Sequence, residues 1–193
     1  MITVFIFCVK NIHNNDESQV DSVSLFQNIV IILVLIAGAG FLSLTEIALA
    51  GARKVKLKIL AESGDDRAQK VLNLQENSAD FFAASQIGLN AVAILGGILG
   101  EGAFRPYFMS FVSRFYTGPW SETISFALSF TLVTSLFILF ADLMPKRLAM
   151  IAPEKISIAV INPIQVFIKV CKPLAWIINA LANLLFRLFK VNT

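Results

Sequence analysis

The chain has 193 residues, of which 56% are hydrophobic, and a formal net charge of +3 at pH 7. This apolar content exceeds the roughly 45–50% that is typical of soluble domains, and the length leaves room for one membrane domain. The net charge is too small to indicate a nucleic-acid partner. The basic residues also cluster beside apolar runs, as they do at the flanks of membrane spans. The two cysteines, Cys8 and Cys171, and the single His13 form no metal or haem motif, so we expect no cofactor within these residues.

Residues 1–22 predict a polar, flexible lead-in outside the cytoplasm. The first ten residues, MITVFIFCVK, contain an apolar run that is too short for a secretory signal and has no basic segment before it.

Three long apolar runs follow, at about 26–52, 81–100 and 124–143. Each can cross a bilayer, which takes about 20 residues. Glu46 is the only charged residue of the first run, and Asp142 stands at the end of the third. A carboxylate at membrane depth costs roughly 2.5–3.5 kcal/mol and usually faces a bundle interior or a water-filled cavity. The sequence therefore predicts an all-α membrane protein with three transmembrane helices that handles positively charged cargo.

The segment 53–78 predicts a hairpin of two short amphipathic helices. Leu57, Leu60 and Ala61 share one face of the first helix, and Ser63-Gly64 ends it. Asn77 or Ser78 can cap the next span. Four apolar residues share one face of the second helix: Ala68, Val71, Leu72 and Leu74.

The positive-inside rule orients the three spans. Four basic residues directly follow the first run and place the hairpin in the cytoplasm: Arg53, Lys54, Lys56 and Lys58. Lys146 and Arg147 follow the third run, so we expect an outside N-terminus and a cytoplasmic C-terminus.

Residues 146–190 predict juxtamembrane helices that form an amphipathic belt on the membrane surface. Pro163 and Pro173 cut this apolar region into pieces of about a dozen residues, which are too short to span. A helical hairpin that re-enters the membrane is the alternative.

Helical spacing places polar residues on common faces of the spans and predicts an oxygen-lined cation site. In the third span Thr131, Ser135 and Asp142 fall on one stripe. The alternative is that these groups join helices by hydrogen bonds, and that Asp142 pairs with Lys146 one turn on. The predicted cargo-binding residues are Ser43, Thr45, Glu46, Gln86, Asn90 and Asp142.

Gly96 and Gly100 form a GxxxG pattern, which permits close helix packing within a protomer or across a dimer. We expect them to help spans two and three form a homodimer. The predicted gating or structural residues are Gly88, Gly96, Gly100, Pro145 and Lys146.

Several motifs resemble the transmembrane domain of the CNNM/CorC proteins, also called hemolysin-C-like, and the resemblance covers residues 26–190. The matching pieces are Phe41-Leu-Ser43-Leu-Thr45-Glu46-Ile-Ala-Leu49, Lys58-Ile-Leu-Ala-Glu-Ser-Gly64, Gln86-Ile-Gly88, Asp142-Leu-Met-Pro145-Lys146-Arg147 and Ala152-Pro153-Glu154. The resemblance implies one domain over residues 23–193, a three-span protomer, a helical belt and a homodimer. Members of this family move Mg²⁺ as exporters coupled to Na⁺.

Chains of this family continue into a pair of cytosolic CBS domains that bind adenine nucleotide. We expect that pair to be missing by truncation here, so a nucleotide would bind only if such domains follow Thr193. The resemblance implies that Ser43, Glu46 and Asn90 would hold Mg²⁺, although the family's Gly-Asn reads Gly88-Leu89 here and Asn90 comes one place later. The family's Ser-Gly-Ser-Glu reads Ser43-Leu44-Thr45-Glu46 here, and its Gly-Glu reads Ala141-Asp142.

The run 86–97 and the ending Phe140-Ala-Asp142 look most like a bacterial inner-membrane branch implicated in export of the polyamines cadaverine and putrescine. The leading hypothesis is an inner-membrane exporter of Mg²⁺ or another divalent cation. A polyamine exporter of the same fold is one alternative, and a non-transporting membrane anchor or sensor is another. No nucleophile–base pair or phosphate-binding loop occurs in the sequence, which argues against an enzyme.

Overall fold

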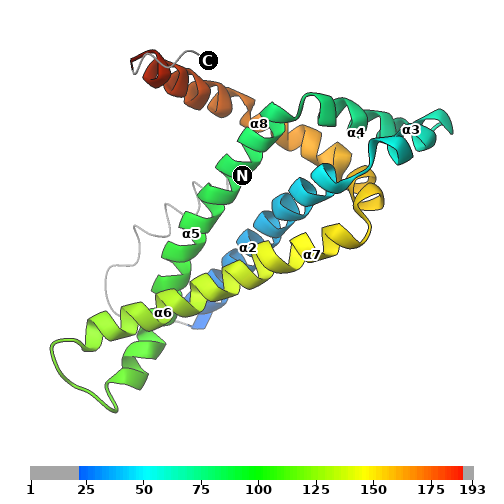
Figure 1. Ribbon diagram of the computed structural model, residues 1–193. Coiled ribbons are helices and arrows are strands. Elements are labelled where there is room, and N and C mark those ends of the chain that lie inside the picture. Colours follow the sequence, from blue (N-terminus) through cyan, green and yellow to red (C-terminus); the bar gives the residue numbers. More distant parts are fainter. Residues whose placement is uncertain (1–21, 189–193) are drawn as a thin grey trace. The chain divides into compact units, whose positions relative to one another are not determined.

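The computed structural model describes the backbone of residues 22–188 and the side chains of residues 26–173, and every regular element in this part is helical (Figure 1). The predicted lead-in lies outside the described residues except for Ser22, which begins the first described helix. In chain order the helices are α2 (Ser22–Gly51), α3 (Lys54–Glu62), α4 (Asp66–Glu76), α5 (Ser78–Val112), α6 (Ser121–Phe137), the π-helical turn η1 (Ile138–Leu143), α7 (Met144–Ile151) and α8 (Pro153–Leu188).

The prediction of an all-α membrane protein is confirmed, but the number of candidate spans differs. Four segments of the described chain are long and apolar enough to cross a membrane: Phe26–Gly51, Ser78–Val112, Ser121–Ile151 and Pro153–Pro173. The first three contain the three predicted spans, and the fourth begins the region that was predicted to form a surface belt.

Helix α8 corrects the expectation that two prolines divide this region. It runs unbroken from Pro153 to Leu188 with Pro163 and Pro173 inside it. A proline removes one backbone hydrogen bond, yet long apolar helices tolerate it where neighbouring groups hold the helix. Ile161 and Ile164 flank Pro163 and are both buried in the core, so packing fixes the helix on each side of the proline.

The second span is also longer than predicted. Helix α5 continues beyond Gly100 to Val112, with Pro106 inside it, so the connection to α6 is shorter than the interval between the predicted runs 81–100 and 124–143. Ala103 and Val112 are buried, so the packed face of the helix continues beyond Gly100. Arg105 Nε lies 3.7 Å from Glu101 Oε1 one turn away, and Arg105 Nη2 donates to Glu122 Oε1 at 3.2 Å.

The third span changes its helical repeat before it ends. Helix α6 passes at Ile138 into the π-helical turn η1 and then into α7, where Pro145 occupies the first turn. The wider i→i+5 repeat rotates the residues that follow it. The predicted stripe of Thr131, Ser135 and Asp142, which assumed one α-helical repeat, is therefore interrupted.

The chain divides into two compact units, residues 1–40 with 91–142 and residues 41–90 with 143–193. Within the first unit α5 packs closely on α6. A Cβ atom added to Gly96 would collide with the ring of Phe137, and one added to Gly100 would collide with Val133 Cγ1. These glycines thus pack on α6 within one chain, which is one of the two predicted alternatives, and their part in a homodimer stays a prediction.

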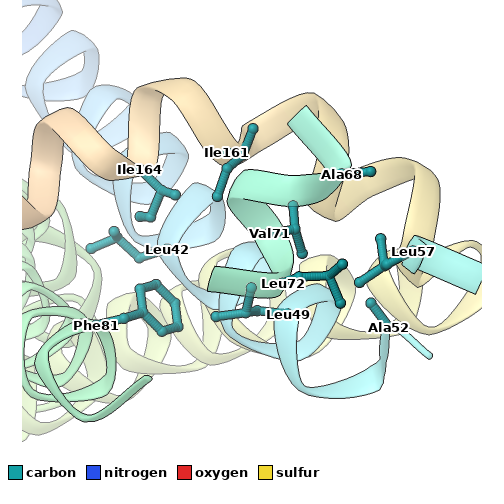
Figure 2. Packing of buried hydrophobic residues seen from close by; sticks show 10 residues of the cluster. All are labelled: Leu42, Leu49, Ala52, Leu57, Ala68, Val71, Leu72, Phe81, Ile161 and Ile164. Carbon is teal, nitrogen blue, oxygen red and sulfur yellow. The ribbon is translucent and has the colours of Figure 1, made fainter. Parts of the chain in front are cut away.

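The second unit has a buried apolar core around the hairpin (Figure 2). Helix α4 packs on α3 and on α8, and the cluster also includes residues of α2 and of the start of α5. Its members are Leu42, Leu49, Ala52, Leu57, Ala68, Val71, Leu72, Phe81, Ile161 and Ile164. The predicted apolar faces of the hairpin are confirmed with one exception: Leu60 is 37% exposed. Leu60 shares a turn with Leu57, which is fully buried, but the core does not extend around the helix to it.

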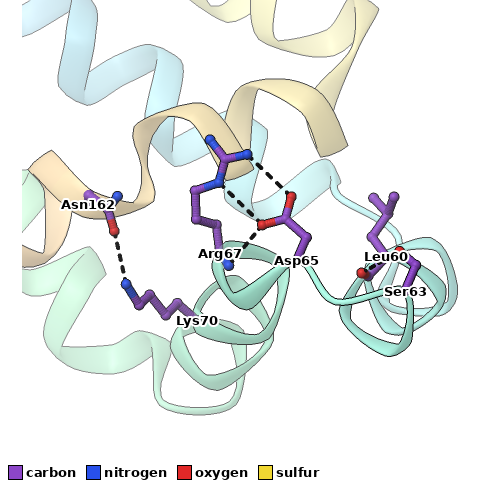
Figure 3. A network of polar contacts seen from close by, with 6 residues as sticks. All are labelled: Leu60, Ser63, Asp65, Arg67, Lys70 and Asn162. Carbon is purple, nitrogen blue, oxygen red and sulfur yellow. Dashed lines mark hydrogen bonds and ion pairs between the residues drawn. The ribbon is translucent and has the colours of Figure 1, made fainter.

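Local hydrogen bonds close the turn between α3 and α4 (Figure 3). Gly64 adopts a φ of +99°, which ends α3 as predicted because glycine has no Cβ penalty in this region. Asp65 caps α4 by accepting from the backbone N–H of Arg67 at 3.0 Å, and the Arg67 side chain lowers the pKa of the Asp65 carboxyl by hydrogen bonding to it. Lys70 Nζ donates to Asn162 Oδ1 at 3.2 Å and joins α4 to α8.

The glycine contacts of α5 predict opposite effects at two nearby positions. Gly100→Ala should lower the free energy of unfolding by about 1–3 kcal/mol, because the added methyl group overpacks against Val133. Gly102→Ala is the matched control, since no atom lies within 4 Å of its added Cβ and alanine favours a helix over glycine by about 0.8–1.0 kcal/mol. Thermal unfolding of both variants in detergent measures the difference. A Gly100→Ala variant as stable as the control would contradict this packing.

Candidate cation site between α2 and α5

The candidate site lies where α2 and α5 face each other within the second unit. A Cβ atom at Gly88 of α5 would lie 2.8 Å from Leu42 of α2, and Phe81 belongs to the same buried cluster as Leu42 and Leu49. Glu46 lies on α2 between these two leucines. The two helices therefore pack against each other over residues 42–49 and 81–88.

Glu46 and Gln86 meet in this contact. The Gln86 side chain donates from Nε2 to Glu46 Oε1 at 3.1 Å, across 40 positions of sequence. Glu46 is half-buried and Gln86 is exposed, so the pair stands at the edge of the helix packing. The structure thus brings together two of the predicted cargo-binding residues and gives the carboxylate a neutral hydrogen-bond donor.

Ser43 and Asn90 extend the pair along each helix. Ser43 is fully buried one turn before Glu46, and Asn90 is exposed one turn after Gln86. Thr45 differs from these residues, because its hydroxyl donates to the backbone oxygen of Phe41 at 2.7 Å and so satisfies its proton within α2. This contact favours a role in the helix for Thr45 over the predicted role in binding.

Gly88 is a packing residue at this site. Its missing side chain leaves room for Leu42 on one side and for Phe167 of α8 on the other, each 2.8 Å from the position of an added Cβ. The close approach of three helices at Gly88 fixes the height at which Gln86 and Glu46 meet. The predicted structural role of Gly88 therefore has a physical basis.

Asp142 belongs to the first compact unit and lies half-buried in the π-helical turn. Such turns are frequent at functional sites because they re-aim one side chain out of the α-helical repeat. Pro145 is buried and Lys146 is half-buried in the first turns of α7. The predicted roles of these three residues in binding and gating remain predictions.

Comparison of the sequence with known proteins identifies the family of the chain. The model of the cyclin M transmembrane N-terminal domain matches residues 30–193. The chain belongs to the CNNM family. The resemblance found in the sequence is confirmed, and Ser43, Glu46 and Gln86 all lie inside the matched region.

Curated relatives of this CNNM domain fall into two groups of similarity. The polyamine export protein of Escherichia coli K12 is 55% identical over 167 residues, which cover 86% of this chain and 37% of the relative. The polyamine export protein of Haemophilus influenzae is 44% identical over 169 residues, with 88% and 39% covered. The UPF0053 protein sll0260 of Synechocystis is 29% identical over 163 residues, with 84% and 36% covered. The chain thus spans well under half the length of these relatives.

The end of α2, which carries Glu46, is held by a residue that sequence reasoning missed. Gln75 of α4 donates from Nε2 to the backbone oxygens of Leu49 at 2.7 Å and Ala52 at 2.9 Å. The last carbonyls of a helix lack partners within that helix, so this side chain satisfies two of them. Beside it lies a cavity of about 180 Å³ lined by Leu49, Ala50, Lys54, Gln75, Ser78 and Phe82.

A buried carboxylate joins the hairpin of this CNNM domain to α8. Glu154 Oε1 accepts from Arg53 Nε at 3.0 Å and lies 3.3 Å from Lys56 Nζ. The sequence indicated Arg53 and Lys56 only as a topology signal and Glu154 only as part of a family motif. The pairing could not be found from local patterns, because Arg53 and Glu154 are 101 positions apart.

The cap on α2 predicts a stability effect of Gln75. Gln75→Ala should lower the free energy of unfolding by about 1–3 kcal/mol, because two helix-end carbonyls near the core lose their donor. Gln69→Ala is the control on the same helix, since its exposed amide bonds only to Asn73 and surface changes usually stay within about 0.5 kcal/mol. Denaturation of both variants in detergent compares them. Equal stabilities would show that water replaces the cap without cost.

Proposed function

We propose that this chain is the membrane domain of a polyamine exporter and that its cargo is a diamine such as cadaverine or putrescine. The observation that carries the proposal is the half-buried Glu46 carboxylate, which the Gln86 amide contacts across two apolar helices. The names of the relatives at 44–55% identity support a polyamine as the cargo.

The chemistry of the pair suits a primary ammonium group. Each ammonium carries three N–H donors and one positive charge, which is the bonding pattern of a lysine head group. Glu46 supplies the charge and up to four acceptor positions, and Gln86 supplies an amide oxygen once its own donor is displaced. A cation that replaces the amide at Glu46 exchanges a neutral donor for a charged one, so that both partners of the hydrogen bond then carry a charge.

A divalent metal, the leading hypothesis of the sequence, has less support. Mg²⁺ demands near-ideal octahedral oxygen coordination and is usually held by one or two carboxylates with several waters. In the part of the chain that the structure describes, no three residues among His, Cys, Asp and Glu lie close enough to hold a metal ion. Export of Mg²⁺ is therefore the second outcome that a transport assay must distinguish.

We also propose an inner-membrane protein with an outside N-terminus and a cytoplasmic hairpin. Length and composition support three or four crossings, and the basic cluster after α2 supports the orientation. A homodimer remains part of the proposal, and Gly96 and Gly100 support the close packing of α5 on α6 within each protomer.

Transport measurements on Glu46 variants test the function. In proteoliposomes that contain the intact protein, Glu46→Gln should reduce cadaverine and putrescine flux by about 10–100-fold, because losing a hydrogen bond to a charged group costs about 1.5–3 kcal/mol. Glu62→Gln is the control, since Glu62 is an exposed carboxylate of α3.

Three outcomes of this assay decide between the alternatives. Flux of both diamines that depends on Glu46 supports the proposal. Flux of Mg²⁺ but not of diamines would contradict the proposal and support a metal exporter. Absence of any cation flux in the wild-type protein would support the non-transporting anchor or sensor.

Cysteine labelling tests the proposed orientation. In a background with Cys8→Ser and Cys171→Ser, Asp66→Cys places a thiol at the exposed start of α4. A membrane-impermeant maleimide should label this thiol only after the cells are opened. Labelling in intact spheroplasts would place the hairpin outside and overturn the topology.

A further inference from the structure

Ser85 has an unusual environment for a serine in a helix. It is fully buried on α5, directly before Gln86. Among the described residues its Oγ has no hydrogen-bond partner. A buried hydroxyl without a partner costs free energy relative to the same group in water, so its retention needs an explanation.

Four other buried hydroxyl groups of the described helices find an acceptor within their own helix. Thr45 donates to Phe41 O, Ser125 to Ser121 O, Ser129 to Phe126 O and Ser157 to Glu154 O, at distances of 2.7–3.1 Å. Each acceptor is the backbone oxygen three or four positions earlier, which is the usual partner of a helical serine or threonine. Ser85 has the same option and does not use it, so its hydroxyl remains available to another group.

Ser85 lies on the side of α5 that faces α2, at the level of Glu46. Phe81, Ser85 and Gly88 recur at i, i+4 and i+7 and so lie on one face of α5. Both ends of that face reach α2, since Phe81 joins the cluster that contains Leu42 and Leu49, and Gly88 approaches Leu42.

Leu42, Glu46 and Leu49 recur on α2 with the same spacing and form the opposing face. Glu46 is in the middle of this face and Ser85 is in the middle of the face on α5. The hydrogen bond between Gln86 and Glu46 confirms that the two helices meet at this height.

We propose that the Ser85 hydroxyl is a cargo-binding group that accepts an N–H from the primary ammonium held by Glu46. This inference rests on the proposed function and specifies its substrate class as primary amines. The ammonium is then bound by three oxygen acceptors, from the Glu46 carboxylate, the Gln86 amide and the Ser85 hydroxyl. Because Ser85 is buried, the cation reaches it only after the Gln86 amide moves away from Glu46.

The proposal assigns different tasks to the three groups. Glu46 provides the charge, and any cation can use it. Ser85 and Gln86 are neutral acceptors, and an ammonium with three N–H donors can bond to both and to Glu46 at the same time. Ser85 therefore contributes to selectivity for a primary ammonium over an organic cation that has no N–H donors.

The experiment compares cadaverine transport by Ser85→Ala and wild type, with the intact protein in proteoliposomes. Ser85→Ala should raise the KM for cadaverine about tenfold, the size expected for a lost hydrogen bond to a charged group, and change the maximal rate less than twofold. Its thermal stability should equal or exceed that of wild type, because the variant removes a buried hydroxyl that lacks a partner. Ser85→Cys keeps the side-chain size with a poor acceptor and should show the same rise in KM.

Ser157→Ala is the matched control. Ser157 is equally buried in the same compact unit but donates to Glu154 O at 3.0 Å, so its variant should keep the wild-type KM. A wild-type KM in both Ser85 variants would overturn the role of Ser85 while leaving the exporter intact. Failure of the wild-type protein to transport cadaverine would overturn the proposed function itself.

Discussion

The structure depends on the cost of holding Glu46 inside an apolar helix. A half-buried carboxylate on an apolar helix needs hydrogen-bond donors, because the leucines beside it on α2 offer none. The chain meets this need by bringing α5 close enough for the Gln86 amide to reach it. Gly88 makes the approach possible, since any larger residue would collide with Leu42 and Phe167. A glycine therefore stands two residues from the group that donates to the charge.

The hairpin and the start of α8 hold the end of α2 in place and so support the contact between Glu46 and Gln86. Gln75 closes the end of α2, and Arg53 and Lys56 hold Glu154 in the first turn of α8. The buried core beneath them joins α2, α3, α4, α5 and α8 in one compact unit. Surface ion pairs are weak singly, but Glu154 is buried, and removal of its partners would leave a charge without compensation. A rigid end of α2 keeps Glu46 opposite the turn of α5 that carries Ser85 and Gln86.

This arrangement relates the family to the proposed cargo. The Glu46 carboxylate with the Gln86 amide beside it offers one charge and a neutral acceptor, to which the proposal adds the Ser85 hydroxyl. A metal ion requires more charge or ordered water, whereas a primary ammonium requires acceptors in number. The similarity to polyamine export proteins and the oxygen acceptors at Glu46 and Gln86 favour the same proposed class of cargo.

The sequence by itself determined the features that follow from composition and local periodicity. The long apolar runs predicted the helical class, the spacing of Leu57, Val71 and Leu72 predicted the buried faces of the hairpin, and Gly64 predicted the end of α3. The isolated charge of Glu46 and the helical position of Gln86 predicted two residues that the structure brings into contact.

Only the tertiary structure decided the features that depend on residues far apart in the chain. Burial of Ile161 and Ile164 holds α8 on both sides of Pro163, and burial of Ala103 and Val112 continues the packed face of α5 past Gly100. The partners of Gly96 and Gly100, the Gln75 cap and the pairing of Arg53 with Glu154 leave no local pattern. The hydroxyl of Ser85 could be recognised as unpaired only after its helix was placed against α2. Periodicity shows which face of a helix is apolar, but the partner that covers that face is chosen by packing across the whole unit.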